Sequence, residues 1–259
     1  MKNLFYIKEG RSATAPAIAL NILIVCGAVI AIFWLSLSMI DITFDFSFLP
    51  EYKNWVWRGF LNTIGISICG LVLSLLLGIL TAVGTSSKIL ALRYLCKGYV
   101  TVIRGTPLIM QIYLFYYVIG TAWGIDSRFI SGALILSVFE GAYISEIIRG
   151  SYLSIDETQL EAARAVGFDK KQTLRYVILP QMIARTVPAL AGQFASIIKD
   201  SSLMSVIALV ELSQTFKEIS TSTFHMFESY LTLGAIYLCL TLPITFISKY
   251  LERRFYYEN

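Results

Sequence analysis

Long uncharged runs of apolar residues recur along the chain, and shorter intervals between them carry most of the charged side chains. A helix of about 20 apolar residues is long enough to cross the hydrocarbon core of a bilayer. The pattern therefore predicts an all-α, polytopic membrane protein. The predicted spans are six in number and cover approximately residues 17–40, 59–83, 108–123, 129–148, 187–210 and 229–250.

The positive charges predict the orientation of these spans. Lys and Arg gather in the N-terminal segment, at 84–99, at 150–185 and near the C-terminus, whereas the other intervals hold few of the 21. Cytosolic flanks of membrane helices carry such an excess. We therefore expect both termini and the interval 150–185 in the cytosol. The first apolar run exceeds the core of a signal peptide, so we interpret it as a retained span.

Composition supports a membrane protein and excludes several other classes. The chain is 56% hydrophobic and only 15% charged, unlike a water-soluble domain. Its net charge of +4 comes from cations beside apolar runs, so we expect a lipid bilayer and no nucleic acid as its partner. The four cysteines lack metal-ligand or redox spacing, and no phosphate-binding Gly-x-x-x-x-Gly-Lys-Ser/Thr sequence occurs. We expect no metal, no catalytic residues and no ATP hydrolysis by this chain.

The longest polar interval predicts a short helix, a tight turn and a second helix. Ser154 and Glu157 have the spacing of a capping box, and Gly167 is suited to end the helix that follows. Asp169 and Gln172 have the same spacing and predict the next helix start. Pro180 predicts the place where that second helix ends or bends.

The same interval carries a family resemblance. Glu161, Ala162 and Ala163, then Gly167, then Leu179 and Pro180, resemble the EAA loop of permease subunits of binding-protein-dependent ABC importers. Val177 stands where that family usually has isoleucine. Taken alone, the interval also fits an ordinary cytosolic helix-turn-helix.

Further motifs in the expected order extend the resemblance to about residues 57–254, and to the polar amino-acid branch of the family. Arg104-Gly105-Thr106-Pro107 is one, in which Thr106 is suited to cap and Pro107 to begin the third span. Lys199-Asp200-Ser201-Ser202-Leu203 is another, within a fifth span that Val187-Pro188 is expected to open. The others are Asn62-Thr63, Ala142-Tyr143 with Arg149-Gly150, and Val210-Glu211-Leu212 at the start of a predicted outer loop.

The resemblance implies a type I ABC importer permease fold, with a five-helix core and an extra N-terminal transmembrane helix. It divides the chain into residues 1–57, a transmembrane domain at 58–254 with the EAA loop at about 150–185, and a short tail at 255–259. It further implies the bacterial inner membrane and ATP-driven uptake of a polar amino acid by alternating access. The implied partners are an ABC ATPase dimer that binds ATP-Mg, an extracytoplasmic substrate-binding protein and a second, identical or different, permease subunit.

Four charged residues within or beside the spans are candidates for a gate or a substrate pathway. Glu140 falls near mid-membrane, on a face of small and polar residues, where an unpaired charge is costly. Lys199 and Asp200 are adjacent opposite charges that form either an internal ion pair or part of the pathway. Arg104 either reaches the cytosolic interface or serves gating or docking.

The remaining charged residues predict structure rather than chemistry. Glu146 and Arg149 have the spacing of an ion pair on one helix, and His225, the only histidine, has no second ligand near it in sequence. Two other functions remain open at this point. One is a proton-coupled secondary amino-acid carrier that uses Glu140 and Asp200, and the other is a membrane scaffold that transports nothing.

Overall fold

The computed structural model describes residues 14–39 and 44–256, which form two units divided between Asp45 and Phe46. In the first unit, α2 (Ala15–Ser38) is a single, mainly apolar helix without charged residues. Several predicted features lie outside the described residues: Lys2, Lys8 and Arg11, Asp41, and residues 257–259 of the tail. The predicted division of the chain after residue 57 stays a prediction.

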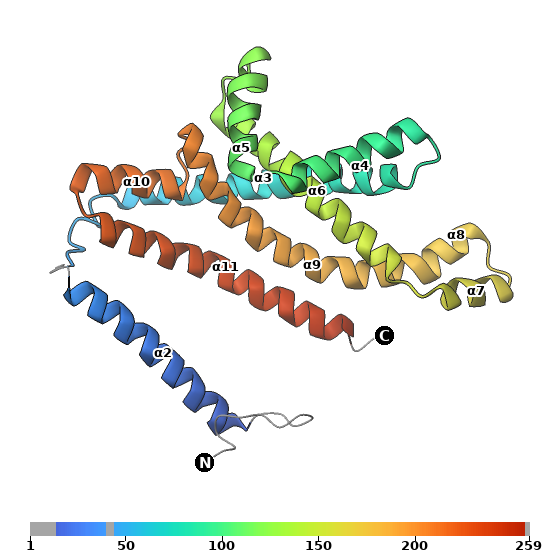
Figure 1. The fold of residues 1–259 in the computed structure, drawn as a ribbon, viewed down its shortest axis with the longest axis horizontal. Coiled ribbons are helices and arrows are strands. Elements are labelled where there is room, and N and C mark those ends of the chain that lie inside the picture. Colours follow the sequence, from blue (N-terminus) through green and yellow to red (C-terminus); the bar gives the residue numbers. More distant parts are fainter. Residues whose placement is uncertain (1–13, 40–43, 257–259) are drawn as a thin grey trace. The chain divides into compact units, whose positions relative to one another are not determined.

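The second unit is built from helices, and its described residues contain no strand. In chain order they are α3 (Lys53–Thr85), α4 (Leu90–Gly105), α5 (Leu108–Tyr113), the π-helical η1 (Leu114–Gly120), α6 (Arg128–Leu153), α7 (Glu157–Ala165), α8 (Lys170–Thr173), the π-helical η2 (Leu174–Ile178), α9 (Leu179–Asp200), the 3-10 helix η3 (Ser201–Ile207), α10 (Leu212–Thr223) and α11 (Met226–Tyr256). Figure 1 shows α9 and α11 running alongside each other, with α7 and α8 at one end of the unit.

The most extensive packing joins α3 and α6, and small residues make it possible. Gly78 lies so close to α6 that an added Cβ would be 2.6 Å from Cγ2 of Ile144. At Gly70 the same atom would be 3.5 Å from Leu136. Glycine and serine allow membrane helices to approach this closely. Gly70 and Gly78 therefore lie in the contact between α3 and α6.

A sharp break separates α4 from α5, where their axes differ by 113°. The predicted N-cap at Thr106 is wrong, because Thr106 belongs to the end of α4 and its hydroxyl donates to the carbonyl of Val102 at 2.8 Å. Pro107 occupies the cap position of α5 instead. The interval 84–99, expected to be a connection between spans, contains the start of α4. This helix is amphipathic, and its charged residues made the interval look like a loop in the sequence.

One continuous helical run extends from Lys170 to Asp200 through α8, η2 and α9. Pro180 does not end this run, because α9 continues beyond it to Asp200. A five-residue π-helical turn lies just before this proline. Pro188 lies inside α9, so the predicted helix start at Val187-Pro188 is wrong. The α-helix stops at Asp200, ten residues before the predicted end of the span, and a 3-10 helix follows.

The predicted outer loop after Glu211 is also wrong, because residues 212–223 form α10. The Glu211 carboxylate caps this helix and accepts from the backbone N–H groups of Gln214 and Ser213 at 2.7 and 2.8 Å. It also accepts the Tyr237 hydroxyl of α11 at 2.9 Å. Burial raises the pKa of Glu211 to about 7, even though these hydrogen bonds oppose the rise.

Four described helices are long and apolar enough to cross a membrane: α2, α3, α6 and α11. The bent pair of α4 with α5 and η1 makes a fifth if it counts as one span. The predicted fifth span falls partly on α9, which does not meet this criterion. That helix is amphipathic, with Arg185, Gln193, Lys199 and Asp200 on it.

Candidate functional site

The first candidate site is the segment of residues 154–180, which we call the connecting segment. Its first helix, α7, begins one residue after Asp156, whose side chain accepts from the backbone N–H of Thr158 at 3.0 Å. The predicted capping box of Ser154 and Glu157 is therefore wrong, because Ser154 is the C-cap of α6. Hydrogen bonds from Thr158 hold the pKa of Asp156 below its usual range, and the bond from the Thr158 backbone N–H has the largest effect.

The turn after α7 depends on Gly167. This residue has a φ of +83°, which a side chain disfavours. The Gly167 N–H donates to the Arg164 carbonyl, and the Phe168 N–H to the Ala163 carbonyl, each at 3.0 Å. This pair of bonds is the Schellman motif, which satisfies the last carbonyls of a helix. The predicted helix end at Gly167 is confirmed.

The second helix begins as predicted. Asp169 accepts from the Gln172 backbone N–H at 2.8 Å, and the Gln172 side chain accepts from the Asp169 N–H at 2.8 Å. This is a complete capping box. Because α8 continues into η2 and α9, Leu179 and Pro180 are the first residues of α9 rather than the end of a helix.

Two hydrogen bonds that the sequence did not reveal hold the connecting segment to α9. Gln181 donates to the side chain of Gln159 on α7, and Arg185 donates to the hydroxyl of Ser154. Both pairs join residues far apart in sequence, so no local pattern predicts them. Together they tie α7 and the end of α6 to the beginning of α9.

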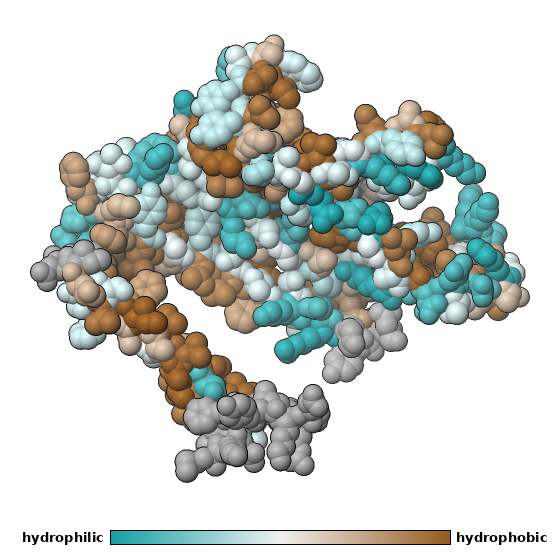
Figure 2. Space-filling model, viewed as in Figure 1, coloured by the Kyte–Doolittle hydropathy of each residue, from teal (hydrophilic) through white to brown (hydrophobic). Residues whose placement is uncertain are grey.

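Most of the predicted coupling residues lie on the surface. Glu161, Ala162, Gly167, Leu179 and Pro180 are exposed, whereas Ala163 is buried. The surface around them is mainly hydrophilic, with hydrophobic residues in between (Figure 2). The large exposed apolar side chains of this part are Val166, Phe168, Leu174, Tyr176 and Leu179. A polar segment with apolar side chains on its outside fits contact with another protein.

The second candidate site surrounds Glu140 on α6. Glu140 is fully buried, together with Ala133, Ser137, Ile144 and Ser145 of the same helix face. Its Oε2 accepts a hydrogen bond from the side chain of Gln193 on α9, while its Oε1 has no hydrogen-bond donor. The carboxyl of Asp200, two helical turns beyond Gln193, interacts with it electrostatically. The structure thus unites Glu140 and Asp200, and adds Gln193, which sequence reasoning missed.

Lys199 is separate from this cluster. Its side chain is exposed and forms no ion pair with any of the described residues. The internal Lys199–Asp200 ion pair, one of the two predicted alternatives, is therefore not formed in this subunit. Gln193 could have been recognised from its spacing, since a residue seven before Asp200 lies on the same side of a helix.

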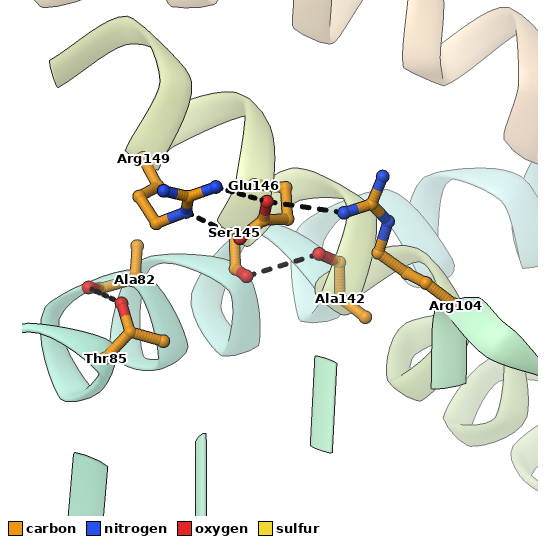
Figure 3. Close-up of polar contacts among 7 residues, drawn as sticks. All are labelled: Ala82, Thr85, Arg104, Ala142, Ser145, Glu146 and Arg149. Carbon is orange, nitrogen blue, oxygen red and sulfur yellow. Dashed lines mark hydrogen bonds and ion pairs between the residues drawn. The ribbon is translucent and has the colours of Figure 1, made fainter. Parts of the chain in front are cut away.

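Arg104 belongs to a third group, shown in Figure 3. Its guanidinium lies 3.3 Å from Glu146. It also lies 5.2 Å from the centre of the Tyr143 ring. Arg149 meets the same carboxylate through two hydrogen bonds of 2.7 Å. The predicted Glu146–Arg149 pair is confirmed, and the structure adds a second arginine from α4 that joins this helix to α6.

The other candidates for chemistry remain structural. His225 stacks on Phe48 with ring centres 4.8 Å apart, and its Nδ1 lies 3.5 Å from Glu228. Among the described residues, no group of three or more His, Cys, Asp or Glu side chains could hold a metal. All four cysteines are free thiols.

Comparison with known proteins finds relatives that match most of this chain. The chain is 34% identical over 208 residues to a protein of Bacillus subtilis named probable glutamine ABC transporter permease protein GlnM, covering 80% of this chain and 96% of that one. It is 34% identical over 214 residues to the glutamine transport system permease protein GlnP of Escherichia coli K12, covering 82% and 97%.

Solved structures agree with these relatives. A chain from the crystal structure of an amino acid ABC transporter with histidines matches with a TM-score of 0.77 and 32% identity, over 82% of this chain and 100% of that one. A chain of the inward-facing MetNI methionine ABC transporter shares the fold, with a TM-score of 0.64 and 19% identity. The predicted type I importer permease fold is thereby confirmed, and the extra N-terminal helix is compatible with it. The family model described as "Binding-protein-dependent transport system inner membrane component" matches residues 74–256, and the chain belongs to this family.

Proposed function

We propose that this chain is the membrane-spanning subunit of an ATP-driven importer that carries a polar amino acid across the bacterial inner membrane by alternating access. The observation that carries the proposal is the connecting segment: an exposed helix, a turn fixed by Gly167 and a second helix that continues into the unit. Relatives that are named glutamine permeases support a substrate of that kind.

In this proposal the connecting segment docks on a separate ATPase that binds ATP-Mg. Glu161 is exposed and available for a polar contact. Ala162 is also exposed and small enough for the two backbones to approach closely, while Ala163 anchors α7 to its own subunit. Val166 and Phe168, which are 72% and 37% exposed, then pack into the partner. An ATPase dimer, a second permease subunit and an extracytoplasmic binding protein complete the assembly.

Movement reaches the membrane through one helical run. Closure of the ATPases around ATP displaces α7 and α8, and the run from Lys170 to Asp200 moves with them. Asp200 lies at the far end of this run and Gln193 two turns before it, so the displacement changes the surroundings of Glu140. This is alternating access by rigid-body motion.

The polar cluster is the proposed substrate contact. The carboxyls of Glu140 and Asp200 attract the ammonium group of an amino acid, and the free Oε1 of Glu140 is able to accept a hydrogen bond from it. Of the two cations considered for the substrate carboxylate, Lys199 has no ion pair among the described residues, whereas Arg104 is engaged by Glu146 and Tyr143. Arg104 is assigned instead to a gate between α4 and α6.

The test begins with purification of the tagged chain from its own host in mild detergent. We expect an ABC-type ATPase to accompany the wild type and to be lost, or to hydrolyse ATP without uptake, in Gly167→Asp. Normal coupled uptake by that variant would refute the docking role. Uptake that survives ATP depletion but collapses with the proton gradient would instead establish a secondary carrier. An assembled complex without any uptake of an amino-acid panel would favour a scaffold.

A further inference from the structure

A large apolar cavity opens where α3 and α6 end. It has a volume of about 780 Å³ and lies between the last turns of these two helices, the start of α4 and the first turns of α9. Leu80, Val83, Leu92, Ile148 and Met182 supply much of its lining. Leu80 and Val83 are each 69% exposed, so no part of the described unit covers them.

A second cavity of about 500 Å³, which has charged residues in its wall, adjoins the first. Three cations line it, Lys97 and Arg104 from α4 and Arg149 from α6, against the single carboxylate of Glu146. Thr85 and Thr101 are also in its wall. The cavity therefore carries an excess of positive charge and several hydrogen-bond donors.

The two cavities are adjacent. Ser86, Arg149 and Tyr152 line both of them, so a single elongated molecule could occupy the two at once. Such a molecule must have an apolar part on the side of Leu80 and an anionic part on the side of Lys97. The cations are able to receive an anion, because Glu146 binds the two arginines but Lys97 has no ion pair among the described residues.

The position in the fold fits a lipid. Both α3 and α6 qualify as membrane spans, and the cavities lie at the C-terminal ends of both. Span ends lie where the hydrocarbon core meets the headgroups, and cations there attract anionic lipids. A soluble anion would leave the apolar cavity unexplained, and a neutral lipid would leave Lys97 without a counter-charge among the described residues.

We propose that these adjacent cavities bind one anionic phospholipid, its phosphate at Lys97 and Arg149 and an acyl chain along Leu80 and Val83. The lipid would bridge α3, α4 and α6. The inference requires only that the chain lies in a bilayer and does not depend on which substrate is transported.

The experiment measures lipid retained by the intact complex. The purified complex is exchanged into mild detergent with equal amounts of dioleoyl phosphatidylglycerol and dioleoyl phosphatidylcholine, and bound lipid is counted by native mass spectrometry. Wild type is compared with Lys97→Gln, with Leu80→Trp, which fills the apolar cavity, and with Lys249→Gln. Lys249 is an exposed lysine of α11 outside both cavities, and serves as the matched control.

We expect Lys97→Gln to retain about fivefold less phosphatidylglycerol than Lys249→Gln, since one cation near a membrane surface contributes about that factor. Leu80→Trp should lower the binding of phosphatidylglycerol although no charge changes, and glycerol phosphate at millimolar concentration should not displace the lipid. Equal retention by Lys97→Gln and Lys249→Gln would overturn the proposal. So would displacement by glycerol phosphate, which would make the site one for a free anion, or retention of phosphatidylcholine as strong as that of phosphatidylglycerol.

Discussion

The backbone of Gly167 offers the sharpest test of the connecting segment. Its φ of +83° lies in the left-handed region, and a Cβ added there would meet no other atom within 4 Å. Any damage from a small substitution must therefore come from the backbone conformation and not from a collision. This separates conformational strain from steric clash, two causes that are usually mixed.

The expected cost follows from that geometry. A non-glycine residue in the left-handed region loses roughly 1–2 kcal/mol, more if it is β-branched and less if it is asparagine or aspartate. A loss of this size shifts an equilibrium by roughly 5- to 30-fold. We expect the fraction of permease that retains its ATPase to be highest in Gly167→Asn, lower in Gly167→Ala and lowest in Gly167→Val. Gly167→Asp adds a negative charge at the C-terminal end of α7, which the helix dipole disfavours.

The assay reconstitutes each variant complex in nanodiscs and measures ATPase retention and substrate-stimulated ATP hydrolysis on the same sample. Thermal unfolding of the permease alone serves as the control for misfolding. If Gly167→Asn were as defective as Gly167→Val, the left-handed turn would not be the cause. Wild-type coupling in Gly167→Val would refute the geometric argument altogether.

Three other predictions concern packing, the polar cluster and pH. Gly78→Ala should destabilise the permease by about 1–3 kcal/mol, because the new Cβ would be 2.6 Å from Ile144. Gly98→Ala on α4 is the control and should not destabilise it, because no atom lies within 4 Å of an added Cβ there. Thermal unfolding in detergent measures both variants. Gln193→Leu should reduce uptake about tenfold and leave ATPase retention unchanged, because the buried Glu140 then loses its hydrogen-bond donor. Unaltered uptake would remove Gln193 from the pathway. Because the pKa of Glu211 is raised to about 7 in the fold, its contribution to stability is fully present at low pH and is lost as pH rises through about 7. Melting temperature should therefore fall between pH 5 and pH 8 in wild type and fall less in Glu211→Gln, and identical slopes would contradict this.

Local chemistry predicted some of these features and not others. The turn at Gly167 and the capping box of Asp169 and Gln172 depend on neighbouring residues alone, so the sequence was sufficient. The start of α7 was misplaced by two residues because Ser154 and Asp156 are both good caps, and the end of α6 already occupied Ser154. Neighbouring structure decided between two local options of similar strength.

Tertiary context decided the larger differences. Pro188 was expected to begin a helix, yet α9 passes through it, as membrane helices tolerate a proline when nearby groups satisfy the freed carbonyl. The carbonyl freed by the missing N–H of Pro188 is that of Ala184, whereas the Ser248 hydroxyl of α11 donates to the carbonyl of Pro188 itself at 2.8 Å and ties α11 to α9 at this point. Gln193 and Arg104 likewise reach Glu140 and Glu146 from other helices. The sequence could identify the two carboxylates and place Gln193 on the same side of its helix as Asp200, but it could not show which groups meet across the helices.

The continuous run from Lys170 to Asp200 has a thermodynamic consequence. A helix of this length extends about 45 Å, and its regular hydrogen bonding is interrupted only at one π-helical turn and at Pro180 and Pro188, which have no backbone N–H. If the docked ATPase changes the affinity of the polar cluster for its ligand through this run, then the ligand must change the affinity for the ATPase by the same factor. Occupancy near Asp200 should thus be measurable as a tighter or looser grip on the ATPase, in the absence of any ATP turnover.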